Sequence, residues 1–263
     1  MRATYALLLL CFLAVLSPSV CLAAPASVYI EDLTWTELRD LVAAGRTIAI
    51  VPVGGTEQNG PHLALGKHNV RVKLLAGRIA ARLGNALVAP VLPYVPEGGL
   101  DPPTGHMRFP GTITAPQDAF EKVVEYAARS LARHGFRDIV LIGDHGSYQK
   151  DLAAVAQRLN RDWAKTPARA HAISEYYDQS AHGFAKLLES RGYSAAEIGS
   201  HAGLADTSLM MALDPSLVRS DRRRPGEGDN GDPRRASAAL GDSGVELIVT
   251  KTIEAIRRAT ARR

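Results

Sequence analysis

Imidazole and carboxylate side chains gather in three short stretches of this sequence. They are Glu57, His62 and His68 in the first stretch, Asp144 and His145 in the second, and His201 and Asp206 in the third. Neutral histidine combined with Asp or Glu is the ligand set that zinc, manganese and iron accept. Taken singly, each residue also fits a helix cap or a backbone hydrogen bond. Burying these side chains close together would cost free energy unless a cation or a substrate compensated their charges and polar groups.

The elements that would position these residues follow an alternating pattern. Short β-rich runs alternate with longer helical ones, which predicts an α/β fold with three layers (α/β/α) and a mostly parallel sheet. The predicted strands are 47–53, 86–95, 138–142 and 170–176, and the predicted helices are 34–44, 69–83, 117–134, 149–165, 181–191 and 243–262. Ligands bind beyond the carboxyl ends of parallel strands. The first two polar stretches follow two of these strands, and the Gly- and Pro-rich segment 96–116 is expected to be a functional loop.

The N-terminal segment 1–24 reads as a secretory signal peptide. A basic start at Met1-Arg2 precedes an apolar run over 7–16 and small residues near Ala23 and Ala24. The run is shorter than the roughly 20 residues that cross a bilayer, so we expect cleavage, export to the periplasm or beyond, and no stable membrane insertion. The only cysteines, Cys11 and Cys21, lie in this segment. The remainder, 25–263, would be one domain without a disulfide or a thiolate metal ligand.

Four ordered motifs resemble those of the creatininase family. Residues 54–68, Gly-Gly-Thr-Glu-Gln-Asn-Gly-Pro-His-Leu-Ala-Leu-Gly-Lys-His, are similar to the family's opening Glu-Gln-His-Gly-Pro-His-Leu-Pro-Leu-Gly followed by Thr-Asp. Phe-Pro-Gly-Thr at 109–112, Gly-Asp-His-Gly at 143–146, and His-Ala-Gly with Asp-Thr-Ser over 201–208 resemble further family segments. The likeness extends from about 34 to 262. It implies a creatininase-like fold, a homo-oligomer that is often a hexamer, and a metal-dependent amidohydrolase.

The resemblance also implies a metal-ligand set, with departures. The family's opening motif supplies a Glu, a His two residues later, and an Asp eleven after the Glu that bridges two metal ions. Here those places hold Glu57, Asn59 and His68, so the bridging carboxylate is missing. We therefore expect one tightly held ion, or two held differently from the family norm, with zinc or manganese favoured and iron possible. The implied ligands are Glu57, His68, His145 and Asp206, with Asp144 as an alternate.

The expected reaction is hydrolysis of a C–N bond in a small cyclic amide by water activated on a divalent cation. His201 is the first candidate to protonate the leaving nitrogen, and Asp206 is a ligand or a base. Substrate contacts are expected from four residues: His62, His106, Arg108 and Tyr148. Tyr176 and Tyr177 are further candidates for the pocket wall, although core packing fits at least one of them.

Two other functions remain open from the sequence. An exported protein could bind a small ligand on this fold without turning it over, and Asn59 and His68 are the best support for that alternative. The formal net charge is +4, but the basic residues are scattered except for a cluster at 219–224. That cluster lacks interleaved aromatic residues, which favours a solvated loop and argues against a nucleic-acid partner. The second alternative is a structural protein that binds a partner through this basic loop, and such binding would weaken sharply with salt and ignore chelators.

Overall fold

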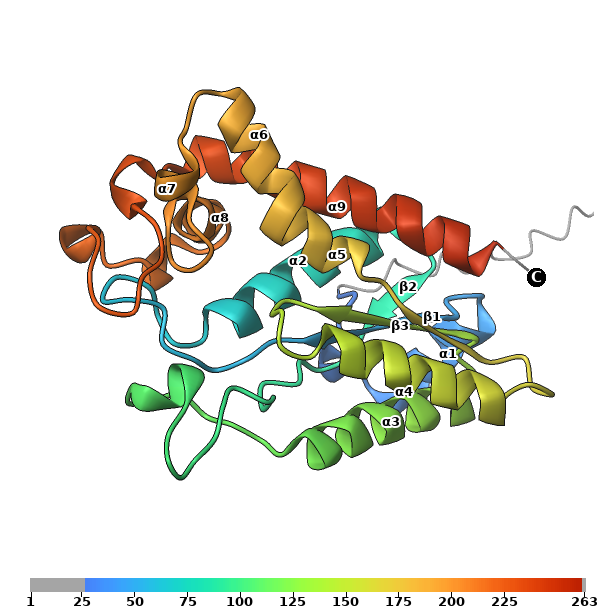
Figure 1. The fold of residues 1–263 in the computed structure, drawn as a ribbon. Helices are drawn as coiled ribbons and strands as arrows, with labels where there is room; N and C mark the ends of the chain where they lie inside the picture. Colours follow the sequence, from blue (N-terminus) through green and yellow to red (C-terminus); the bar gives the residue numbers. More distant parts are fainter. Residues whose placement is uncertain (1–26, 262–263) are drawn as a thin grey trace, which may run out of the picture.

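The computed structural model describes residues 27–261, which form a parallel four-stranded sheet between two layers of helices (Figure 1). The strands are β1 (Ile48–Val53), β2 (Ala86–Val88), β3 (Asp138–Gly143) and β4 (Arg169–Ala172), in the order β2-β1-β3-β4. The predicted three-layer α/β class is confirmed. The predicted signal peptide lies outside the described residues, and within 27–261 no helix is long and apolar enough to cross a membrane.

The central strand β1 is buried on both faces because helices cover both sides of the sheet. Its alternating side chains divide between two hydrophobic clusters, with Ile48 and Ile50 in one and Val51 and Val53 in the other. Ile50 lies opposite Val88 of β2 and Val140 of β3 in the parallel register. This explains why the strand reads as a continuous apolar run without polar alternation.

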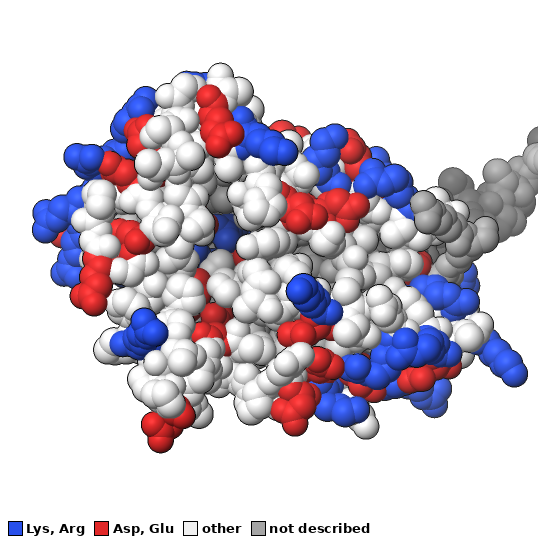
Figure 2. Space-filling model, in the orientation of Figure 1, with Lys and Arg blue, Asp and Glu red and all other residues white. Residues whose placement is uncertain are grey.

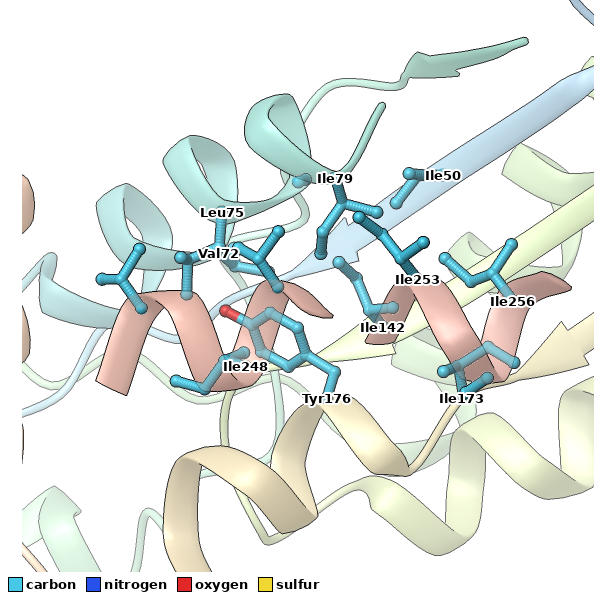
Figure 3. Packing of buried hydrophobic residues seen from close by; sticks show 14 of the residues in the cluster. Ile50, Val72, Leu75, Ile79, Ile142, Ile173, Tyr176, Ile248, Ile253 and Ile256 are labelled. Carbon is cyan, nitrogen blue, oxygen red and sulfur yellow. The ribbon is translucent and has the colours of Figure 1, made fainter. Parts of the chain in front are cut away.

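One helical layer consists of α2 (Lys67–Leu83), α5 (Glu175–Asp178), α6 (Phe184–Ser190) and α9 (Ala238–Thr260). Figure 3 shows Ile50 and Ile142 of the sheet packed against Leu75 and Ile79 of α2 and Ile253 of α9. Burying one such side chain contributes up to about 1.5–3 kcal/mol. This contact fixes α2, and with it the residues at the N-terminus of α2, against the carboxyl edge of the sheet.

The opposite layer consists of α1 (Trp35–Ala43), α3 (Gln117–Arg133) and α4 (Gln149–Asp162). The predicted cap at Thr34 is present: its side chain accepts a hydrogen bond from Glu37 N, while Glu37 reaches back to Thr34 N in a capping box. Beyond the carboxyl edge of the sheet, a smaller group of elements includes α7 (Ala195–Ile198), α8 (Leu204–Leu213) and the loops around them.

Several predicted boundaries were wrong. β2 ends at Val88, and only isolated bridges at Leu92 and Val95 follow it. Pro90 and Pro93 interrupt the ladder because proline has no backbone N–H to donate. The predicted strand 170–176 ends at Ala172, and the chain then turns into α5. α9 begins at Ala238, five residues earlier than predicted, where Ser237 accepts a hydrogen bond from Leu240 N.

The strand order places a topological switch point at the carboxyl ends of β1 and β3. From β1 the chain crosses to β2 on one side, and β3 then joins the other side of β1. A crevice opens where the connections diverge in this way, and it is the usual ligand site of open parallel sheets. Glu57 follows β1, and Asp144 and His145 directly follow β3. The topology therefore brings the first two polar stretches together.

Candidate metal centre

Glu57 is the centre of the polar cluster and is fully buried. Four imidazoles surround its carboxylate. The distances are 2.7 Å from Oε1 to His68 Nε2, 3.7 Å from Oε1 to His201 Nδ1, 3.1 Å from Oε2 to His106 Nε2, and 3.3 Å from Oε2 to His145 Nε2. Two groups have the spacing of a metal site, with all ligand atoms within 4.8 Å of one another: Glu57 with His68 and His145, and Glu57 with His106 and His201.

His68 lies between two carboxylates. Its Nδ1 is 2.5 Å from Asp144 Oδ1, while its Nε2 faces Glu57. Asp144 is held in turn by Arg71 Nε at 2.9 Å and by the Tyr176 hydroxyl at 2.6 Å. A histidine that donates Nδ1–H to a carboxylate presents a lone pair at Nε2, which is the arrangement that orients metal-binding histidines. Asp144 therefore lies outside both groups that have the spacing of a metal site, and its contact with Nδ1 orients His68.

Asp206, which the sequence predicts as a metal ligand, belongs to an ion-pair network with Lys67 and Arg71. It lies in the first turn of α8, a helix that the sequence did not predict. Its Oδ2 accepts from Lys67 Nζ at 2.8 Å and its Oδ1 from Arg71 Nη1 at 2.5 Å. Burial alone would raise the pKa of Asp206, but the charges of Lys67 and Arg71 outweigh it and hold the pKa well below its usual range. Neither metal group among the described residues includes Asp206.

Gln58 fixes the two histidines of the second group. His201 Nε2 lies 2.9 Å from the Gln58 carbonyl oxygen and 3.1 Å from the Gln58 side-chain nitrogen. The carbonyl can only accept, so the tautomer that satisfies it donates from Nε2 and keeps a lone pair on Nδ1, which faces Glu57. Burial, followed by the charge of Lys67, lowers the pKa of His201 to about 4. Its neutral ring at neutral pH suits metal binding and argues against the proton-donor role expected from the sequence. The Gln58 side-chain amide lies 2.9 Å from His106 Nδ1.

Glu97 is a further carboxylate at this centre, and the sequence analysis missed it. It is 4% exposed, and its Oε2 lies 3.9 Å from His145 Nε2. Burial raises the pKa of Glu97 to about 8, against the opposing charge of His145. For His145, burial would lower the pKa, but the neighbouring Glu57 and Glu97 carboxylates raise it. The position of Glu97 in the sequence could have revealed it, because Glu97 follows Val95 at the end of the second predicted strand.

Three residues expected to contact substrate lie elsewhere. The Tyr148 side chain is fully buried, and its hydroxyl bonds to the Val53 and Gly54 carbonyl oxygens. Tyr148 therefore anchors the loop after β1 from inside the core. His62 is also fully buried, with Nε2 2.9 Å from Thr207 Oγ1. Arg108 is exposed in a short 3₁₀ turn and does not line the pocket described below.

A pocket of about 480 Å³ opens over this centre. It is a suitable size for a small molecule. Its wall includes His68, His145 and His201 of the ligand groups, together with Lys67 and Tyr177. Figure 2 shows the molecule hollowed on this face, with charged side chains at the bottom of the hollow. Glu57 does not itself line the pocket; its fully buried carboxylate lies behind His68, His145 and His201, which do.

The donor set fits a divalent cation. Glu57 Oε2 and both oxygens of Glu97 lack a hydrogen-bond partner within residues 27–261, although all three atoms are buried. Buried carboxylate oxygens normally have partners, and a cation would supply one here. Burial lowers the pKa of His106 as well as that of His201, which keeps both rings in the neutral form that metals bind. Glu57 would hold such an ion with either pair of histidines, His68 and His145 or His106 and His201.

The chain is similar to several known proteins. The family model described as creatinine amidohydrolase matches residues 31–256. The creatinine amidohydrolase of Pseudomonas putida is 30% identical over 259 residues, covering 88% of this chain and 96% of that protein. The mycofactocin precursor peptide peptidase of Mycolicibacterium smegmatis is 28% identical, covering 80% of this chain and 85% of that protein. A solved structure described as creatininase with Mn superposes with a TM-score of 0.73 at 30% identity, covering 89% of this chain and 98% of that one.

Proposed function

Because this chain belongs to the creatininase family, we propose that it is an exported metal-dependent hydrolase of a C–N bond in a small cyclic amide. The observation that carries this proposal is the buried Glu57 carboxylate at ligand spacing from His68 and His145, two histidines that line a small pocket. Export rests on the sequence of residues 1–24, and the cyclic amide on the likeness to creatinine amidohydrolase. The similarity to a peptide peptidase leaves a modified peptide as another substrate class to screen.

Each residue of the centre would have a distinct role in this reaction. Glu57, His68 and His145 would hold a divalent cation, with zinc, manganese or iron matching the donors. Such a cation would lower the pKa of a bound water and polarise the amide carbonyl. Asp144 would keep His68 in the ligand orientation through the 2.5 Å contact at Nδ1. His201 Nδ1 would accept a hydrogen bond from the attacking water.

Lys67 is our candidate for the proton donor to the leaving nitrogen. Its side chain lines the pocket, and Asp206 Oδ2 is the one hydrogen-bond acceptor that its ammonium group has among the described residues. An ammonium group has three N–H donors. Two of them are therefore free to bond a carbonyl oxygen or the departing nitrogen, a role that His201 cannot fill in its neutral form.

The test is elemental analysis of the purified protein beside Glu57→Ala and His68→Ala. We expect one or two equivalents of zinc, manganese or iron in the parent protein and a loss in both variants. His134→Ala, which removes an exposed histidine outside the site, is the matched control and should keep its metal. The loaded protein is then screened for ring opening of creatinine and other cyclic amides. Metal-free protein that cannot be reloaded would overturn the hydrolase assignment and favour a small-ligand-binding protein.

A further inference from the structure

Glu97 is a buried carboxylate without a conventional partner. Neither of its oxygens has a hydrogen-bond partner in the described part of the chain, and the residue is only 4% exposed. A buried carboxylate is normally paired with a cationic side chain, with several N–H donors, or with a metal ion. Glu125 illustrates the usual case in this same molecule: it is equally buried, but Lys122, Arg129 and Arg158 contact its oxygens.

The surrounding structure holds Glu97 in place. Its backbone N–H donates to Thr114 Oγ1 at 3.0 Å, and the carbonyl of Pro96 accepts from Ser147 Oγ at 2.9 Å. Ser147 Oγ also lies 2.8 Å from His145 Nδ1, which ties the Glu97 loop to the imidazole that Glu97 faces. A Cβ on Gly55 would lie 2.6 Å from Glu97 Oε1, so only a glycine leaves room for this carboxylate.

Glu97 and Glu57 converge on one atom. Glu97 Oε2 lies 3.9 Å and Glu57 Oε2 lies 3.3 Å from Nε2 of His145. Two buried carboxyl groups that approach the same point repel each other when both are ionised. A proton on one of them relieves the repulsion, as the pKa of Glu97 reflects in being raised by burial and by Glu57, and a metal cation between them would replace that proton. Bonds of about 2.0–2.1 Å to a tetrahedral zinc ion place its ligand atoms roughly 3.3–3.4 Å apart. The Glu57 distance already has this value, and a small shift of the Glu97 side chain would give it the same.

We propose that Glu97 is a ligand of the same divalent cation as Glu57, His68 and His145, an inference that rests on the proposed metal-dependent function. Glu97 then supplies a second carboxylate to the centre. The opening motif itself does not, because it has His68 at the place where the family has an Asp. Two carboxylates and two imidazoles would fill a tetrahedral ion, so water or substrate would bind by expansion to five ligands, or to an ion such as manganese that takes six. The ion would also tie the loop that begins at Glu97 to the loop after β3.

The test compares Glu97→Gln, which keeps the shape and removes the charge, with the matched control Glu125→Gln. Mn²⁺ and Co²⁺ affinities are measured by competition with a chromophoric chelator, and the visible spectrum of the Co²⁺ form reports the ligand set. We expect Glu97→Gln to lose affinity by at least tenfold and to change the Co²⁺ spectrum, because it removes a charged ligand. Glu125→Gln should keep the parent affinity and spectrum.

Each other outcome is informative. An affinity within twofold of the parent and an unchanged spectrum in Glu97→Gln would overturn the inference while leaving the proposed function intact, provided that Glu57→Ala loses its metal. A parent protein that binds neither ion would overturn both. If Glu97→Gln fails to fold by circular dichroism, Glu97→Asp takes its place: its carboxylate is one methylene short, so weaker binding and a shifted spectrum support the inference, and parent values refute it.

Discussion

At the scale of single residues, the site depends on a contrast between paired and unpaired carboxylates. The carboxylate oxygens of Asp144 and Asp206 accept hydrogen bonds from Arg71, and Asp206 also accepts one from Lys67. In contrast, Glu57 and Glu97 keep carboxylate oxygens without a hydrogen-bond partner within residues 27–261. The positive charges of Arg71 and Lys67 compensate Asp144 and Asp206, so these two carboxylates can orient neighbouring side chains. The second pair faces histidines and has no Arg or Lys of the described chain against its oxygens, and this difference separates positioning residues from candidate ligands.

Asp144→Asn should weaken metal binding without changing the stoichiometry at saturation. The substitution removes the charge that holds the Nδ1 hydrogen of His68, and such changes typically cost 10–100-fold in metal affinity. It also leaves Arg71 with less compensation, which we expect to lower the melting temperature. Chelator competition and thermal unfolding measure the two effects. Asp151→Asn on α4 is the control, and an unchanged affinity in Asp144→Asn would argue against the orienting role.

Asp229 should make stability depend on pH. Its side chain is 2% exposed, Oδ1 has no partner among the described residues, and burial raises its pKa to about 6. Because the folded-state pKa lies above the unfolded value of about 3.8, the folded state is penalised once this carboxyl ionises, and stability falls between about pH 4 and pH 6. Asp229→Asn should therefore raise the melting temperature at pH 8 and leave it unchanged near pH 4. A gain of equal size at both pH values would contradict this account.

At the scale of elements, the position of His201 depends on a close contact between two loops. The backbone of His201 exchanges hydrogen bonds with Asn230 in an antiparallel bridge. Gly199 lies beside this bridge with a φ of 65°, and a Cβ there would lie 1.8 Å from the Asn230 carbonyl oxygen. No side chain fits at such a position without moving the backbone.

Gly199→Ala should accordingly destabilise the fold much more than Gly192→Ala. Both glycines have positive φ, but a Cβ at Gly192 meets no described atom within 4 Å. The Gly192 variant carries only the backbone strain of about 1–2 kcal/mol, whereas the Gly199 variant must also separate two loops. Urea unfolding of both variants gives the comparison. Equal losses would mean that the loop contact adds nothing to the strain.

At the scale of the whole molecule, the centre joins segments that are far apart in the sequence. Glu57 follows β1, Glu97 and His106 lie in the loop before α3, His145 follows β3, and His201 precedes α8. An ion bound by several of these segments binds the folded chain and not the unfolded one. Its binding free energy therefore adds to the stability of the entire domain.

Removal of metal should lower the melting temperature of the domain as a whole. At a free metal concentration of one hundred times the dissociation constant, the stabilisation is about 2.7 kcal/mol. Thermal unfolding in a chelator and in rising concentrations of Mn²⁺ or Zn²⁺ measures it. The midpoint should rise with metal concentration in the parent and stay constant in Glu57→Ala; parallel behaviour of the two proteins would place the ion elsewhere.

The amino-acid sequence by itself determined the fold class and most elements, because apolar periodicity and capping residues such as Thr34 act locally. The position of Glu57, His68 and His145 after buried strands also made them candidates, and the resemblance to the creatininase family implied that they are metal ligands. Only the tertiary structure decided how the remaining charges pair. Asp206 pairs with Lys67 and Arg71 of α2, Tyr148 turns into the core, and Glu97 reaches His145 from another loop. Charge pairing depends on distances of a few ångströms between distant segments, and no local pattern in the chain encodes those distances.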